Sequence, residues 1–162
     1  MKHFCLEEFT HSATASALKV DNTPTSAHVE HIIELVNNLL DPLREAWAIE
    51  CANEHLGTPA LIVTSGYRGF RLNEAVSGSN TSAHCIGYAA DIVPRNGKLR
   101  EFKIFCHEWL KKKQMPFDQM ISEKEDANGT PRWIHLGFKN RAGSQRRQFL
   151  TMRNGKYYAM SK

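Results

Sequence analysis

The sequence predicts an α+β domain in which a small, mostly antiparallel sheet has helices packed on one side. Two observations predict this class. Segments with helical periodicity gather in the first third of the chain and recur once near its middle, whereas strand-like segments follow one another toward the C-terminus. The length of 162 residues, with 41% hydrophobic and 23% charged residues, is typical of one globular domain, here residues 1–162.

The first segment, residues 1–26, is rich in Thr, Ser and Ala and has turn residues at Asp21-Asn22-Thr23-Pro24. Phe4, Leu6 and Phe9 are apolar residues near its start that could anchor it. We therefore expect an N-terminal arm that packs on the domain through these three side chains.

A long helix is expected next. Apolar residues recur at steps of three and four from Val29 to Leu43, which places them on one helical face. Asp41-Pro42 resembles an N-cap followed by a first helical residue, so the helix is expected to restart or kink there. Gly57 and Pro59 then end it.

The remaining elements follow from apolar runs, β-branched residues and turn residues between them. Strands are expected over 60–65, 89–93, 117–122 and 133–138, helices over 72–76 and 99–112, and a closing hairpin over 149–152 and 157–160 around Asn154-Gly155.

Composition limits the classes of partner. The net charge of +4 is mild and its basic residues are spread out, so we expect no nucleic-acid partner, although the charge suits an anionic cell-wall polymer. No apolar segment is long enough to span a membrane, and the polar N-terminus lacks a secretory signal. The four cysteines form no CxxC pair and indicate reduced thiols. We expect a monomer made in the cytoplasm.

Two segments carry candidate metal ligands. His84 and Asp91 lie on either side of Gly87, which allows a tight turn, and His135 interrupts a later apolar run. A carboxylate between apolar strand residues is costly unless it is paired or bound to metal. Two imidazoles and one carboxylate can hold Zn²⁺ and leave one position open for water, as in a hydrolase.

The chain resembles the M15 family of zinc D-Ala-D-Ala carboxypeptidases and related phage endolysins. Four segments carry the resemblance in order: Thr64–Arg68, Ser82–Asp91, Phe117–Ile121 and Trp133–His135. The pattern S-x-H-x-x-G-x-A-x-D is matched at every fixed position. These positions are Ser82, His84, Gly87, Ala89 and Asp91.

The resemblance implies a fold like that of Hedgehog and DD-peptidase domains. It also implies that His84, Asp91 and His135 bind zinc and that Arg68 binds substrate or stabilises the transition state. An arginine suits this role because its planar fork can bind a carboxylate or a developing oxyanion.

The general base is the point at which this chain departs from the family pattern. Many family members carry an acidic residue three positions before the last zinc-binding histidine, where this chain has Arg132. Glu123 is our preferred substitute, because its strand can run beside the strand of that histidine. Glu125 and Asp126 remain alternatives.

Other polar residues have weaker claims. Ser82 and Gln119 are expected to support the site by hydrogen bonding and to contact substrate. His28 and His31 lie one helical turn apart and could bind metal, but an exposed helix start is the preferred interpretation.

These residues favour a zinc peptidase that cleaves D-Ala-D-Ala or L-Ala-D-Glu bonds of peptidoglycan stem peptides. A protein of this kind would act on the cell wall after release by another protein. Two alternatives stay open: a non-catalytic zinc-containing module that binds the wall or belongs to a phage particle, and a zinc hydrolase of free dipeptides.

Overall fold

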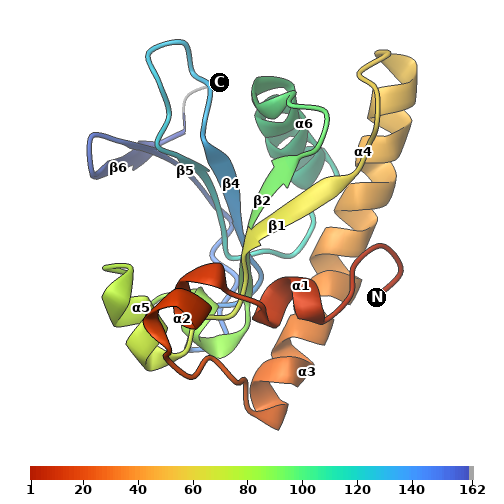
Figure 1. Cartoon of the computed structure of the whole chain (residues 1–162). Coiled ribbons are helices and arrows are strands. Elements are labelled where there is room, and N and C mark those ends of the chain that lie inside the picture. The colour runs from red at the N-terminus through yellow and green to blue at the C-terminus, as the bar shows by residue number, and fades with distance from the viewer. Residues whose placement is uncertain (161–162) are drawn as a thin grey trace.

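The computed structural model describes residues 1–160, and it shows an α+β fold built on one six-stranded sheet (Figure 1). The predicted class is confirmed. The strands lie in the order β1-β2-β4-β3-β5-β6. Their bounds are β1 Leu61–Ser65, β2 Ala89–Pro94, β3 Gln119–Glu123, β4 Trp133–Gly137, β5 Gln148–Arg153 and β6 Lys156–Ala159.

The sheet is mixed, which corrects the expectation of a mostly antiparallel sheet. β4 inserts between β2 and β3, so both of its edges are paired. The chain after β4 therefore crosses to the free edge of β3 and arrives in the direction of β3, with Ile121 opposite Leu150 in a parallel pair. The pattern of apolar residues predicts where the strands lie in the sequence, but it does not predict that the chain crosses to the free edge of β3.

The two faces of the central strands differ sharply. Successive side chains of a strand point to opposite faces. On one face the side chains of β2, β3 and β4 are fully buried and, apart from Ser122, apolar, namely Ala90, Ile92, Met120, Ile134 and Leu136. The other face carries polar side chains at the alternate positions, including Asp91, Glu123 and His135.

Helices account for most of the first half of the chain. None of those within residues 1–160 has the length and apolar composition that a membrane-spanning helix needs. The bounds are α1 Glu7–Thr10, α2 Ala13–Leu18, α3 Ser26–Leu35, η1 Val36–Leu40, α4 Asp41–Asn53, α5 Phe70–Ala75, η2 Ala83–Ile86 and α6 Leu99–Lys112.

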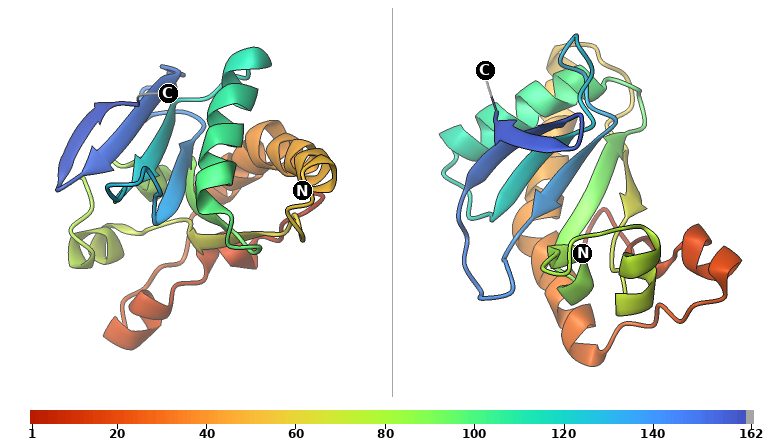
Figure 2. Two further views of the ribbon diagram at one scale, coloured as in Figure 1. Left: turned by 90° about the horizontal axis from the view of Figure 1, so that it is seen from above. Right: turned by 90° about the vertical axis from the view of Figure 1, so that its left-hand side faces the viewer.

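The longer helices cover the apolar face of the sheet (Figure 2). Trp47 of α4 packs edge-on against Phe102 of α6, with the ring centroids 5.1 Å apart, and both side chains are fully buried. The short helices α2 and α5 border the opposite, polar face (Figure 1). The polar face is therefore left open enough to bind a ligand.

The backbone stays helical through Asp41-Pro42, but its geometry changes there: the π turn η1 ends at Leu40 and α4 begins at Asp41, with Pro42 in its first turn. Pro42 has no N–H, and its ring would collide with the carbonyl group four residues earlier in a regular α-helix. The helix widens into the π turn η1 just before the proline, and the Asp41 N–H bonds to the Val36 carbonyl. This wider turn accommodates the proline.

The N-terminal segment is held in place by buried apolar side chains and by hydrogen bonds to Asp41. Phe4 and Phe9 are buried in the core, and Leu6 packs against it. The Asp41 carboxylate accepts hydrogen bonds from the backbone N–H groups of Lys2 and His3, at 2.7 and 3.0 Å. Residues 1–10 are thus held against the long helix.

Short elements differ from the sequence prediction in detail. The helix expected over 99–112 is confirmed as α6, whereas the one expected over 72–76 begins two residues earlier, at Phe70. α2 was not predicted, although Ser12 accepts a hydrogen bond from the Ala15 N–H in the manner of an N-cap. η2 places His84 in a tight turn, as expected.

Gly87 ends η2 with a φ of 81°, and a Cβ at this position would lie 2.6 Å from the His28 carbonyl oxygen. We expect Gly87→Ala to lower the free energy of unfolding by about 1–2 kcal/mol from backbone strain, with a further loss from the clash. Urea unfolding followed by tryptophan fluorescence measures this.

The matched control is Gly97→Ala. Gly97 has a similar φ of 75°, but an added Cβ would meet nothing within 4 Å. Only the strain should appear in this variant. Equal losses in the two variants would show that the contact with His28 is unimportant.

Candidate metal centre

His84 is held by the turn that follows β1. Its Nδ1 lies 2.7 Å from the Gly66 carbonyl oxygen, and its side chain is 1% exposed. Gly66 itself packs against the N-terminal segment, where the Tyr67 N–H donates to the Phe9 carbonyl at 2.7 Å. A Cβ at Gly66 would collide with the Phe9 backbone, so only glycine allows this approach.

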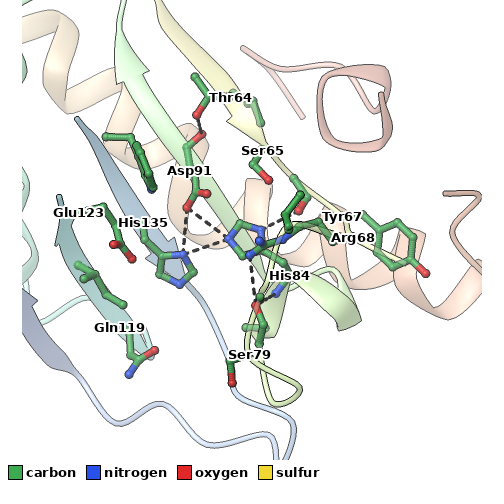
Figure 3. Close-up of a pocket in the computed structure, with 18 of the residues that line it drawn as sticks. Thr64, Ser65, Tyr67, Arg68, Ser79, His84, Asp91, Gln119, Glu123 and His135 are labelled. Atoms are coloured by element: carbon green, nitrogen blue, oxygen red, sulfur yellow. Dashed lines mark hydrogen bonds and ion pairs between the residues drawn. The ribbon is translucent and has the colours of Figure 1, made fainter. Parts of the chain in front are cut away.

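Asp91 and His135 come from the neighbouring strands β2 and β4. They are direct partners in the antiparallel ladder, so their side chains lie on the same face. Both are buried, at 8% exposure each. Figure 3 shows His84 completing a triangle with them.

The three ligand atoms are evenly spaced. His84 Nε2 lies 3.2 Å from Asp91 Oδ1 and 3.1 Å from His135 Nδ1, and the latter two atoms are 3.1 Å apart. Ligands of tetrahedral zinc at about 2.0 Å from the metal are about 3.3 Å apart. The arrangement therefore fits one zinc ion with an open fourth position.

The hydrogen bond to Gly66 also fixes the tautomer of His84. A carbonyl oxygen only accepts, so Nδ1 carries the proton and Nε2 of the neutral ring presents a lone pair. Burial lowers the pKa of His84, which favours this neutral form despite the attraction of Asp91. Without a cation, the lone pair of His84 Nε2 faces an oxygen of the Asp91 carboxylate, which also carries only lone pairs. A single proton on His135 Nδ1 can be donated to only one of these two acceptors. A divalent cation satisfies all three groups.

Glu123 lies beside this triangle. It pairs with Trp133 across β3 and β4, which puts it on the face of His135, and its carboxylate lies next to that imidazole (Figure 3). The side chain is 8% exposed. Burial, reinforced by the charge of Asp91, raises the pKa of Glu123 against the opposing charges of His135 and Arg68. The carboxylate is thus a better proton acceptor than an exposed one.

Arg68 borders the site from the other side. Its backbone N–H donates to the His84 carbonyl at 3.1 Å, and its guanidinium donates to the Ser82 hydroxyl at 3.4 Å. Within residues 1–160, Nε of Arg68 is buried without a hydrogen-bond partner. Ser82 also accepts from the His84 N–H at 3.3 Å, so it holds both residues. Arg68 keeps donor capacity for a ligand in the cleft.

Gln119 also lines the cleft, but it lies at the far end of β3 from Glu123 (Figure 3). Its side-chain amide donates to Gln148 at 2.9 Å rather than to a residue of the triangle. Gln119 therefore belongs to the rim of the cleft.

Glu125 forms ion pairs and a hydrogen bond that stabilise the fold. Its fully buried carboxylate binds Lys103 at 2.7 Å, Arg153, and the hydroxyl of Ser122 at 2.5 Å. Despite burial, hydrogen bonds from Arg153, Lys103 and Ser122 lower its pKa to about 2. Glu125 lies outside the cleft lining, so it is poorly suited to accept a proton there.

Asp126 and Arg132 also lie outside the cleft lining. The Asp126 carboxylate accepts from the N–H groups of Asn128 and Thr130, at 2.9 Å each, and closes the turn between β3 and β4. Arg132 is exposed just before β4. Among the carboxylates considered from sequence, Glu123 alone borders the triangle.

The other candidate histidines have structural contacts. The backbone N–H of Thr25 donates to His28 Nδ1 in a capping box at the start of α3. His31 stacks on Tyr88 with ring centroids 4.1 Å apart. Within residues 1–160, the only group of His, Cys, Asp and Glu placed to share a metal is His84, Asp91 and His135.

The triangle lies in a cleft of about 1110 Å³, several of whose walls the sequence did not identify. One wall is formed by Glu8 and residues 11–14 of the N-terminal segment, and another by Leu150 of β5 and Tyr157 of β6. Because side chains alternate along a strand, Tyr157 and Tyr158 point to opposite faces of the sheet. The sequence alone does not show which of them faces the cleft, because that depends on the crossing of the chain to β5.

Most residues of the site lie in a part of the chain that matches a known protein family. The family model described as Peptidase M15 matches residues 2–125, which is more than half of the chain. The match includes Arg68, His84, Asp91 and Glu123, whereas His135 and the strands β4 to β6 follow it. Among curated proteins, no relative matches the chain.

The triangle predicts binding of one zinc ion per chain. His84→Ala should weaken zinc affinity by at least about 100-fold, because loss of even an outer-shell partner costs 10–100-fold. Calorimetric titration and metal analysis measure this. His55→Asn, which changes an exposed histidine, should leave the affinity unchanged. Equal affinity in His84→Ala and the wild type would rule the triangle out as the zinc site.

The Glu125 network predicts an acid-dependent stability. Its pKa is lowered from 4.5 to about 2, so its contribution is full above pH 4.5 and is lost as pH falls toward 2. Glu125→Gln should cost about 3–5 kcal/mol at pH 7. Urea unfolding from pH 7 to pH 2 should show a shallower acid dependence in this variant, but not in the exposed control Glu101→Gln. An unchanged pH slope in Glu125→Gln would contradict this role.

Proposed function

The chain belongs to the peptidase M15 family, and from this premise we propose that it is a zinc-dependent peptidase that hydrolyses amide bonds in peptidoglycan stem peptides. The observation that carries the proposal is the spacing of 3.1–3.2 Å among His84 Nε2, Asp91 Oδ1 and His135 Nδ1, beside a buried carboxylate and a guanidinium. When bound, zinc would supply the Lewis acidity that lowers the pKa of water and polarises a carbonyl group.

Glu123 is the general base of this proposal. Its burial and raised pKa suit a group that takes a proton from the attacking water. The same carboxyl then returns that proton to the departing amine as the amide bond breaks. One residue on the rigid strand β3 can serve both steps because its carboxylate lies beside His135 (Figure 3).

Arg68 is the anion-binding group of the proposal. Its buried Nε has no partner within residues 1–160, and Ser82 holds the other end of the guanidinium. Two roles suit it: binding the terminal carboxylate of a D-Ala-D-Ala substrate, or stabilising the oxyanion formed at an internal L-Ala-D-Glu bond. The position of the cleaved bond distinguishes these roles.

A non-catalytic module that binds the cell wall is the second candidate, because Arg132 stands where the acidic residue of many family members is expected. Purified peptidoglycan separates the candidates. The enzyme should release fragments in a chelator-sensitive reaction, and the masses of the muropeptides identify the bond. A binding module should sediment with the wall and release nothing.

The decisive variant is Glu123→Gln. It keeps the shape of the side chain but removes the base, so we expect turnover to fall at least about 100-fold while zinc binding is retained. Muropeptide release and metal content measure the two effects. Glu74→Gln, at an exposed position of α5, is the matched control. Full turnover in Glu123→Gln would exclude this carboxylate as the base.

A further inference from the structure

The β5–β6 hairpin places a tyrosine on the polar face of the sheet, where the cleft lies. Ile121 of β3 lies opposite both His135 of β4 and Leu150 of β5, so Leu150 shares their face. Met152 follows two residues later on the same face, and it pairs with Tyr157 of β6. The strand register therefore points Tyr157 into the cleft, which agrees with the cleft lining.

The neighbouring Tyr158 points the other way. It pairs with Thr151, whose side chain is 4% exposed and lies on the core side of β5. Tyr158 is absent from the cleft lining. The two tyrosines thus differ in the face they occupy, but both are about half exposed, at 59% and 51%.

Tyr157 has no structural role that explains its position. Its ring lies outside the buried core, and no hydrogen bond within residues 1–160 uses its hydroxyl group. A large aromatic side chain at the mouth of a cleft, with a free polar end, is typical of a binding contact.

The hydroxyl group of Tyr157 also lies within electrostatic reach of the site. Burial raises its pKa, and the charges of Glu123 and Asp91 raise it further, against the opposing charge of Arg68. The phenol therefore keeps its proton at neutral pH and acts as a hydrogen-bond donor.

The order of the strands puts two donors on opposite sides of the triangle. Arg68 follows β1 at one edge of the sheet, and Tyr157 lies on β6 at the other edge. Five steps of about 4.8 Å would separate these strands by about 24 Å in a flat sheet. The sheet is twisted (Figure 1), so its edges lie closer together than in a flat sheet, and Arg68 and Tyr157 both line the same cleft.

We propose that Tyr157 contacts the substrate in this cleft and that its phenolic O–H donates a hydrogen bond to the oxyanion that develops at the scissile carbonyl, on the side opposite Arg68. The phenol keeps its proton throughout and forms no covalent bond. The inference rests on the proposed peptidase function, but it concerns a strand that follows the family match at residues 2–125.

The test compares Tyr157→Phe with Tyr158→Phe in the full-length, zinc-loaded protein. Removing the donor should lower kcat roughly 100-fold, as for the loss of one oxyanion-hole donor, with little change in KM. Zinc content and the thermal unfolding midpoint should stay at wild-type values, since the side chain is exposed. Tyr158→Phe should match the wild type in every measurement.

A binding measurement keeps the inference testable apart from turnover. A dipeptide phosphinate carries a tetrahedral anion where the substrate carries its carbonyl group. Its dissociation constant should rise at least about 10-fold in Tyr157→Phe, while the constant of the plain product peptide should change less than about twofold.

The outcomes separate the two proposals. If the wild type cleaves no peptide, the proposed function fails. If the wild type and Tyr157→Phe bind the phosphinate equally, the role of Tyr157 is overturned whether or not peptides are cleaved. A rise in KM with unchanged kcat would also overturn it, because the ring would then serve ground-state binding alone.

Discussion

The hydrogen bond from His84 to the Gly66 carbonyl is the interaction on which the rest of the site depends. It leaves the lone pair of Nε2 pointing at Asp91 and His135. It also joins segments that are far apart in the chain, because Gly66 reaches this position only by packing against the Phe9 backbone. The N-terminal segment therefore supports a candidate metal ligand and also forms a wall of the cleft.

The alternation of side chains on the central strands gives each face of the sheet its own chemistry. Ser122 points to the core side and bonds to Glu125, whereas Glu123 points to the cleft. β3 ends at Glu123, and Lys124 has a φ of 49°, so the chain turns and Glu125 bonds to Ser122 instead of sharing the face of Glu123. The two carboxylates therefore have opposite properties. Cations and a hydroxyl group lower the pKa of Glu125 despite its burial, while burial with few compensating charges raises that of Glu123. One can only stabilise the fold, and the other is suited to proton transfer.

The cleft is assembled from two parts of the chain with different relations to the family. The part that matches the M15 family supplies Arg68, His84, Asp91 and Glu123. The part that follows supplies His135 and the hairpin with Tyr157. Asp91, Glu123 and His135 lie on the central strands β2, β3 and β4, which are paired on both edges, whereas His84 lies in η2, Arg68 follows the edge strand β1, and Tyr157 lies on the edge strand β6.

The sequence by itself determined the segments and their chemical types. Periodicity located the strands and α6, and the intrusion of Asp91 and His135 into apolar runs marked them as costly unless paired or bound to a cation. Only the tertiary structure decided the parallel pairing of β3 with β5, the burial of Glu125 among cations, and the face of Tyr157. The physical reason is that local patterning sets the period of a segment, whereas neighbours and faces depend on how the strands are ordered in the sheet.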